Sequence, residues 1–139
     1  MSNTQLQRLA KPFPGFMIQE KPGKFAAQFV SHSEVVQKLL AVVGPYDFEV
    51  REIIRGDSGK VEAVLATMTV TIDGRVTTIT EVGECERPDN WPTEGARLKD
   101  AASDALKRCA MRFGVGLHLW AQDRFVLSNM LDKEETDEQ

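Results

Sequence analysis

Basic side chains recur along residues 97–112, and lysine and arginine are the residue types that hold phosphate groups. This segment carries five basic and two acidic residues, a net charge of +3, although the whole chain has a net charge of −4. The basic residues are Arg97, Lys99, Lys107, Arg108 and Arg112. Because charged N–H donors form short, strong hydrogen bonds to phosphate oxygens, the first chemistry that this segment suggests is contact with a phosphate backbone.

The same residues have a second interpretation as the solvated rim of a buried helix. On a helical wheel Lys99 and Lys107 fall on one flank of an apolar stripe, and Arg108 and Arg112 fall on the other. Long basic side chains commonly border a buried stripe while their charges stay in water. Asp104 lies four residues before Arg108, a spacing that favours an ion pair. Spacing alone does not decide between the two interpretations.

No pattern of residues indicates covalent catalysis, a metal site or a cofactor. His32 and His118 lie far apart, and neither has a serine or cysteine nucleophile pattern beside it. Cys85 and Cys109 form no CxxC or Cys/His cluster, so we expect reduced thiols and no metal. No glycine-rich nucleotide-binding motif is present. The sequence therefore favours a binding protein over an enzyme.

The basic residues lie on a predicted long helix that begins near Gly95 and is stopped by Gly114. Its apolar residues recur at steps of three and four and are mostly small: Leu98, Ala101, Ala102, Ala105, Leu106, Cys109 and Phe113. Small residues let a helix approach a β-sheet closely. On the phosphate-binding interpretation, this helix borders a groove whose other wall is the sheet, edged by the basic side chains. We also expect an extended segment over 115–120 after the helix.

The remaining elements predict an α+β fold. Ser31 and Glu34 form a capping box that begins a helix ending at Gly44. A three-stranded antiparallel meander follows, with a two-residue turn at Asp73 and Gly74. The other expected elements are a helix over 4–10, a β-hairpin from 16–19 and 25–30, strands over 46–55, 61–72 and 75–82, and a short helix within 123–131. The predicted core is thus β-β-β-α, with the meander packed on the long helix and an N-terminal helix and hairpin beside it.

The acidic excess lies at one end of the chain. Residues 132–139 contain five acids and one lysine, so residues 1–131 are neutral as a group. At 139 residues the chain suits one domain, and we expect a folded domain over 1–131 and a disordered acidic tail over 132–139. An alternative role for the tail is competition with nucleic acid for a basic groove, or contact with a basic partner. Neither a long apolar stretch nor a signal peptide is visible, which predicts a cytoplasmic protein without a membrane partner.

The segment 104–117, DALKRCAMRFGVGL, resembles the signature helix of the Rad-fifty-two family of single-strand annealing proteins, whose core is D-x-L-K-R-x-x-x-x-F-G. The order of elements over residues 5–125 is similar to that family's annealing domain. Phage annealing proteins of the Sak type and the bacterial DdrA group belong to the same superfamily. The resemblance implies ATP-independent binding of single-stranded DNA and annealing of complementary strands in homologous recombination and DNA repair.

The resemblance also implies which residues contact DNA. The family's Lys-Arg pair falls on Lys107 and Arg108, and a family lysine eight residues earlier falls on Lys99. A further family arginine falls on Met111, where this sequence departs from the pattern, and the adjacent Arg112 is a substitute. A basic residue between the N-terminal strands aligns with Lys21, with Lys24 as an alternative.

The expected partners are single-stranded DNA and further copies of the chain in a homo-oligomeric ring or spiral, with a host single-strand binding protein as an additional candidate. The family's long C-terminal extension in eukaryotes is not seen, which suggests a minimal phage or bacterial annealer. Two other classes stay open. One is a passive single-stranded DNA-binding protein, which usually carries more aromatic residues for stacking. The other is a structural or protein-interaction domain with a solvated basic helix.

Overall fold

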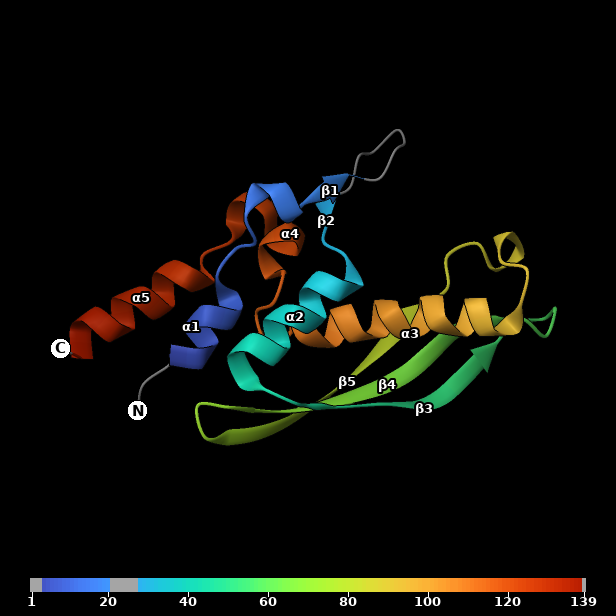
Figure 1. The fold of residues 1–139 in the computed structure, drawn as a ribbon, viewed down its shortest axis with the longest axis horizontal. Helices are drawn as coiled ribbons and strands as arrows, with labels where there is room; N and C mark the ends of the chain where they lie inside the picture. Colours follow the sequence, from blue (N-terminus) through green and yellow to red (C-terminus); the bar gives the residue numbers. More distant parts are fainter. Residues whose placement is uncertain (1–3, 21–27, 139) are drawn as a thin grey trace.

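A computed structural model describes residues 4–20 and 28–138, and its centre is one long helix on a three-stranded sheet. Helix α3 (Glu94–Met111) lies along one face of the sheet, and the other α-helices gather towards one end of it (Figure 1). The sheet consists of β3 (Asp47–Arg55), β4 (Val61–Ile72) and β5 (Arg75–Glu84), all antiparallel, with β4 in the middle. The predicted α+β class and the three-stranded meander are confirmed.

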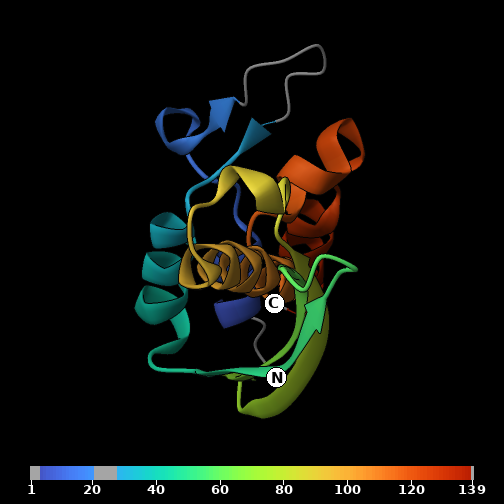
Figure 2. The same cartoon turned by 90° about the vertical axis from the view of Figure 1, so that its right-hand side faces the viewer.

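The smaller elements surround α3. Figure 2 looks along α3 and shows α2 on one side of it and the hairpin of β1 and β2 above it. In chain order they are α1 (Thr4–Ala10), the 3₁₀ turn η1 (Gly15–Met17), β1 (Gln19–Glu20), β2 (Gln28–Phe29), α2 (His32–Val43), η2 (Pro88–Asn90), α4 (Leu117–Ala121), η3 (Gln122–Arg124) and α5 (Leu127–Glu138). The predicted hairpin is confirmed by the antiparallel pairing of β1 with β2.

Local signals in the sequence set several of these boundaries. The Ser31 side chain accepts a hydrogen bond from the Glu34 N–H and the Glu34 carboxylate accepts one from the Ser31 N–H, as the capping box predicted. Asp73 and Gly74 both have positive φ angles, 51° and 82°, which is the backbone of a tight hairpin turn between β4 and β5. Helix α2 and the β4–β5 hairpin are thus fixed by short-range chemistry.

Small residues bring α3 very close to strand β5. Ala101 and Ala105 of α3 are fully buried, and a Cβ atom built on Gly83 of β5 would lie only 2.2 Å from the carbonyl oxygen of Ala101. Leu106 and Cys109 continue the buried stripe towards the rest of the core. The expectation of close packing between a small-residue helix and a sheet is confirmed, and it fixes which side of α3 faces away from the sheet.

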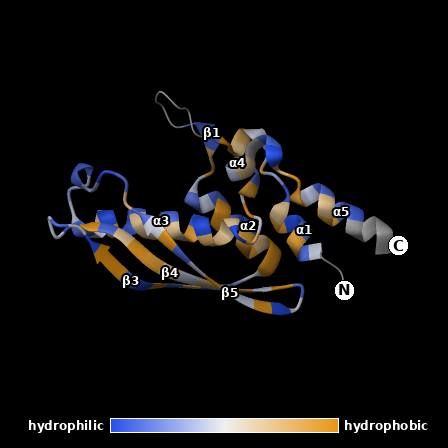
Figure 3. Cartoon of the chain, turned by 180° about the vertical axis from the view of Figure 1, so that it is seen from behind, coloured by the Kyte–Doolittle hydropathy of each residue, from blue (hydrophilic) through white to orange (hydrophobic). Residues whose placement is uncertain are grey.

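The core is divided into two clusters of buried side chains. The larger one joins α1, α2, the end of α3 and β4 through residues such as Leu9, Leu39 and Met68. The smaller one lies between the start of α3 and β4, around Val61 and Val64. Figure 3 colours much of β4, the central strand, as hydrophobic, in agreement with its part in both clusters. A register shift in β3 between Val50 and Glu52 ends the simple alternation of that strand.

Three expectations from the sequence differ from the structure. Residues 115–120 do not form an extended segment, since α4 is helical from Leu117 to Ala121. Gly114 and Gly116 have φ angles of +94° and +72°, so the chain turns twice and folds back onto α3 instead of leaving in an extended path. Helix α3 already ends at Met111 with Arg112 as its C-cap, before Gly114. Part of the expected strand 16–19 is the 3₁₀ turn η1.

Helix α5 extends farther than the sequence indicated. It runs from Leu127 to Glu138 and therefore includes the acidic run, which we expected to be disordered. Glutamate and lysine are good helix formers, and the run contains no glycine or proline that would stop the helix. Contacts with α1 anchor the start of α5: the Gln7 amide donates to the Leu131 carbonyl at 3.2 Å, and the Ser128 hydroxyl donates to the Ala10 carbonyl at 3.2 Å.

Candidate nucleic-acid interface

A cleft of about 260 Å³ lies between α3, strand β2 and α4, and we call it the α3 cleft. Its chemically informative residues are Phe29, Glu86, Asp104, Lys107, Arg108 and Trp120. The sequence predicted that the sheet would form the second wall of a basic groove, and this is wrong. The small-residue stripe of α3 is buried against the sheet, and two of the basic residues beside it, Lys107 and Arg108, face the hairpin and α4.

Arg108 is held on two sides. Its Nε donates to Asp104 Oδ2 at 2.9 Å, and its guanidinium carbon lies 5.1 Å from the ring centroid of Trp120. Both contacts leave the terminal Nη groups without a hydrogen-bond partner among residues 4–20 and 28–138. Since Arg108 lines the cleft, a planar pair of donors is held in place there, in a form suited to a phosphate.

Asp104 is the residue that fixes this arginine. The predicted ion pair at spacing i,i+4 is confirmed, and the same Oδ2 atom also accepts the backbone N–H of Glu84 at 2.9 Å. Glu84 is the last residue of β5, so Asp104 ties the side chain of Arg108 to the end of the sheet. The bond therefore orients Arg108 as well as pairing its charge.

Lys107 lies on the other flank of α3, towards the hairpin. Its ammonium group is 5.3 Å from the ring centroid of Phe29 on β2, within the range of a cation–π contact. One turn earlier, the Ser103 hydroxyl and His32 Nδ1 are 2.9 Å apart, which joins α3 to the start of α2. Partial burial, and then the charge of Lys107, lower the pKa of His32. The imidazole is therefore neutral at physiological pH and does not add a charge to the cleft.

The remaining candidate residues do not meet in this cleft. Lys99 is exposed on α3, two turns before Lys107, and does not line it. Arg112 turns to the sheet, where its Nη1 is 3.2 Å from Glu81 Oε1 on β5. Lys21 and Lys24 lie outside the described residues.

Two aromatic residues of the cleft were missed by the sequence analysis. Trp120 is 51% exposed, which leaves much of its indole available to a ligand, and Phe29 is half-buried under Lys107. The neighbouring residues in the sequence do not identify either aromatic residue as part of a site, because the fold of the chain brings each of them to α3. The only available signal was that both lie in short apolar segments next to turn residues. Phe113, in contrast, is buried in the core, as expected.

Charge in the α3 cleft is balanced. Lys107 and Arg108 face Asp104 and Glu86, so the cleft depends on the orientation of its donors more than on an excess of positive charge. The described residues that line the cleft include no nucleophile beside these charges. Burial, and then the Glu81 carboxylate, raise the pKa of the Cys109 thiol to about 11, and burial also raises that of Cys85. Both thiols are protonated and unreactive at neutral pH. The arrangement is suited to binding an anion.

Two further observations concern the described part of the chain alone. Its His, Cys, Asp and Glu side chains form no group of three placed to hold a metal ion. Within the same residues, no helix combines the length and the apolar character needed to cross a membrane.

Comparison with known proteins assigns the family. The chain is 35% identical over 127 residues to the single-stranded DNA-binding protein DdrA of Deinococcus deserti, and 33% identical over 123 residues to the DdrA of Deinococcus radiodurans. Each match covers 82% of this chain but 55% and 53% of the relatives, so the chain spans about half their length. The family described as Rad52/22 family double-strand break repair protein matches residues 2–138. The chain therefore belongs to the Rad52/22 family, as the signature in residues 104–117 indicated.

Proposed function

We propose that this chain binds single-stranded DNA along the α3 cleft and anneals complementary strands without ATP in recombination and repair. The observation that carries the proposal is Arg108, which lines the cleft and whose guanidinium is held by Asp104 and Trp120. Lys107 adds a second cation on the same helix. The names of the relatives, single-stranded DNA-binding protein DdrA, and the repair function of the family support the same substrate.

The physical logic of annealing rests on which part of the strand is held. Phosphate contacts position a strand without reading its sequence, so the base edges stay available to a complementary strand. Pairing itself is favourable, and the protein supplies a template and neutralises phosphate charge. The chain then needs no catalytic residue and acts as a binding protein.

We propose that the cleft is extended by further copies of the chain in a ring or spiral. In the described sheet, β3 and β5 each have one edge without a neighbouring strand. Exposed edges invite pairing with another chain, so association of copies would cover them. Neighbouring copies would also bring several weakly charged clefts into line along one strand, and a host single-strand binding protein is a candidate to deliver that strand.

A second candidate function is passive binding of single-stranded DNA. It is favoured by the exposed indole of Trp120 and the ring of Phe29 in the same cleft, because aromatic faces let single-strand binders stack bases. Stacked bases are less available for pairing. The two candidates therefore differ in whether the bound strand pairs faster or slower than free DNA.

The test measures binding and pairing in the same samples. Protein is titrated with a labelled oligonucleotide at several salt concentrations, and pairing with the complementary strand is followed without ATP. We expect faster pairing with wild-type protein, and weaker binding for Lys107→Ala and Arg108→Ala. Each lost phosphate contact should reduce the slope of log K against log[salt] by about 0.7.

Arg112→Ala is the matched control, since it removes an arginine at the C-cap of α3, whose side chain pairs with Glu81 on the sheet and does not line the cleft. It should leave the slope unchanged. Binding without acceleration would replace annealing by passive binding. If Arg108→Ala binds with the wild-type affinity and slope, the cleft is not the DNA site, and absence of any binding would leave a protein-interaction domain.

A further inference from the structure

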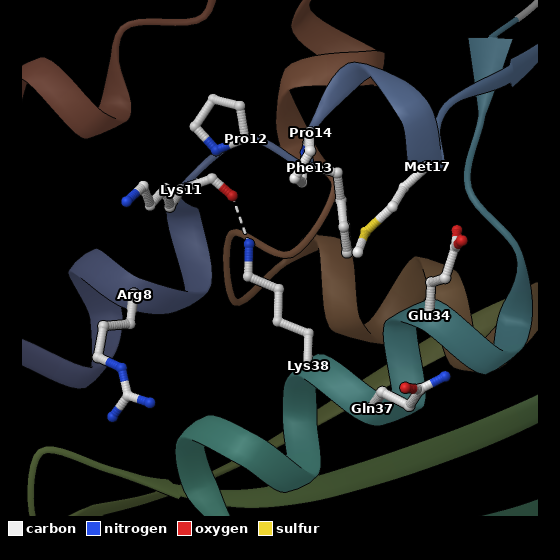
Figure 4. A pocket seen from close by; sticks show the side chains of 9 residues that line it. All are labelled: Arg8, Lys11, Pro12, Phe13, Pro14, Met17, Glu34, Gln37 and Lys38. Carbon is white, nitrogen blue, oxygen red and sulfur yellow. Dashed lines mark hydrogen bonds between the residues drawn. The ribbon is translucent and has the colours of Figure 1, made fainter.

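A second hollow, separate from the α3 cleft, lies between α1, α2 and the loop that follows α1. Figure 4 shows this α1–α2 pocket, which has a volume of about 430 Å³ and shares no lining residue with the α3 cleft. Its charged residues come from both helices and the loop: Arg8, Lys11, Glu34 and Lys38. Three cations and one carboxylate therefore border a space that the proposed DNA-binding function does not use.

Lys38 is the central cation of this pocket. Its ammonium group donates to the backbone carbonyl of Lys11 and lies 4.5 Å from the ring centroid of Phe13 (Figure 4). Glu34, four residues earlier on α2, would be its usual partner on a helix. The Glu34 carboxylate instead accepts the Ser31 N–H at 3.3 Å in the capping box, and Figure 4 shows it directed away from the Lys38 amine. Within the described chain, no carboxylate pairs with Lys38.

The neighbouring cations increase this imbalance. Burial, and then the charge of Lys11, lower the pKa of Lys38 to about 8. Arg8 lies on α1 across the pocket, where its Nη2 donates to the Ala41 carbonyl at 3.4 Å. Because three positive groups share one hollow with a single, otherwise engaged carboxylate, an anion that enters the pocket would relieve their repulsion.

Apart from Gln37, the rest of the lining is apolar and does not suit a nucleobase. Pro12, Pro14 and Met17 supply aliphatic surface, and the flexible thioether of methionine adapts to varied partners. The one aromatic ring, Phe13, is only 7% exposed and lies under the Lys38 ammonium. Proteins that bind single-stranded nucleic acid commonly stack its bases on open aromatic faces. The pocket offers none, whereas a peptide can place an aliphatic side chain against the prolines.

We infer that the α1–α2 pocket binds an acidic segment of a partner protein, with one apolar side chain inserted against Pro12, Pro14 and Met17 and neighbouring carboxylates on Lys38 and Lys11. The positive charge of the pocket complements such a segment and its aliphatic base accepts the apolar side chain, whether or not the α3 cleft binds DNA. The volume of about 430 Å³ is that of a small-ligand site, which suits an anchor residue and its carboxylates.

The chain's own acidic run has similar chemistry but is directed elsewhere. Helix α5 is fastened to α1 by the Gln7–Leu131 and Ser128–Ala10 hydrogen bonds, before the acidic residues begin. The acidic run of a second copy is therefore an alternative occupant, and the experiment separates it from a partner protein by measuring the mass of the protein alone.

The experiment titrates the full chain with the labelled peptide Gly-Asp-Asp-Leu-Asp-Asp-Gly and records affinity and backbone amide shifts. Two control peptides replace either all aspartates with asparagine or the leucine with serine. We expect the acidic peptide to bind and to shift the amides of Phe13, Met17 and Lys38, and both control peptides to bind at least tenfold more weakly. Lys38→Met should reduce affinity roughly ten- to hundredfold, as for a lost hydrogen bond to a charged group.

Matched variants make the outcome decisive. Lys133→Met removes the same charge from an exposed site on α5 and should bind the peptide as the wild type does. Lys11→Ala tests the pocket independently of Lys38. Wild-type affinity for the acidic peptide in both Lys38→Met and Lys11→Ala would overturn the inference, as would equal affinity of the wild-type protein for all three peptides. Competition by inorganic phosphate at the peptide's own concentration would also overturn it. A reduced salt slope for single-stranded DNA in Lys38→Met would instead assign the pocket to nucleic acid, and self-association that Lys38→Met abolishes would assign it to a second copy.

Discussion

Replacing Gly83 with alanine should destabilise the fold, because α3 and β5 touch at this residue. A Cβ atom there would lie 2.2 Å from the Ala101 carbonyl oxygen, 2.3 Å from the Ala105 backbone nitrogen and 2.6 Å from the Ala105 Cβ. None of these atoms belongs to a flexible side chain. The methyl group can fit only if α3 moves away from the sheet.

The size of the effect follows from the kind of atom that must move. Forcing an additional methyl group into a packed core costs about 1–3 kcal/mol. Because the obstacle is the main chain of a long helix, we expect the upper part of this range, about 3 kcal/mol. Lys107 and Arg108 lie on the same helix, so a displaced α3 would also weaken DNA binding.

The assay is urea unfolding of Gly83→Ala beside a control substitution at Gly95, a glycine of α3. Gly95 lies in the first turn of α3, and a Cβ atom there would have no neighbour within 4 Å. Gly95→Ala should therefore raise the free energy of unfolding by about 0.5–1 kcal/mol, through helix propensity alone. If Gly83→Ala unfolds within about 0.5 kcal/mol of the wild type, the close contact between α3 and β5 is refuted.

Three further predictions concern charged and polar side chains. Asp104→Ala should weaken single-stranded DNA binding, although it removes a negative charge, because Arg108 loses the acceptor that orients it; tighter binding would contradict that role. Both ring nitrogens of His118 are buried without a hydrogen-bond partner in the described chain, so His118→Leu should raise the free energy of unfolding by about 1 kcal/mol. Burial, and then the charge of Lys38, lower the pKa of His118 below 6.5. The free energy of unfolding of the wild type therefore falls as the pH drops from 6.5 towards the folded-state pKa. Urea unfolding at several pH values should show a smaller loss for His118→Leu. Lys38 has its pKa lowered from 10.5 to about 8, so wild-type stability rises with pH between these values. Lys38→Met should lack that rise and be about 1–3 kcal/mol more stable at neutral pH by thermal or urea unfolding.

Elements with local signals were predictable from the sequence. The capping box at Ser31 and Glu34 and the turn at Asp73 and Gly74 require only neighbouring residues, and both were found where expected. Even so, Asp73 has a function that its local pattern does not reveal. Its carboxylate accepts the backbone N–H groups of Gln5 and Leu6, at 2.9 Å and 3.2 Å, and so caps the first turn of α1 from 67 and 68 residues away. A turn residue that also caps a distant helix can be recognised only in the fold.

Residues 115–120 were predicted wrongly because a short apolar run has no clear period. Such a run is compatible with a strand or with a buried helix. The deciding factor was the pair of positive φ angles at Gly114 and Gly116, which turn the chain back onto α3. The error had a functional consequence. The predicted extended segment did not bring Trp120 next to Arg108. The sequence analysis therefore missed the wall of the α3 cleft that α4 forms.

The two sequence-based interpretations of the basic helix, a surface ion pair or a phosphate site, are not alternatives in the structure. The Asp104–Arg108 pair exists, and among the hydrogen bonds of residues 4–20 and 28–138 it engages the Nε atom of the guanidinium alone. Since an arginine presents its terminal N–H groups separately from Nε, the pair can hold the side chain while those groups face the cleft. An ion pair that would count as a small contribution to helix stability therefore becomes the means of orienting a binding group. The spacing of residues predicts such a bond, and only the position of Trp120 and β2 shows what the oriented group faces.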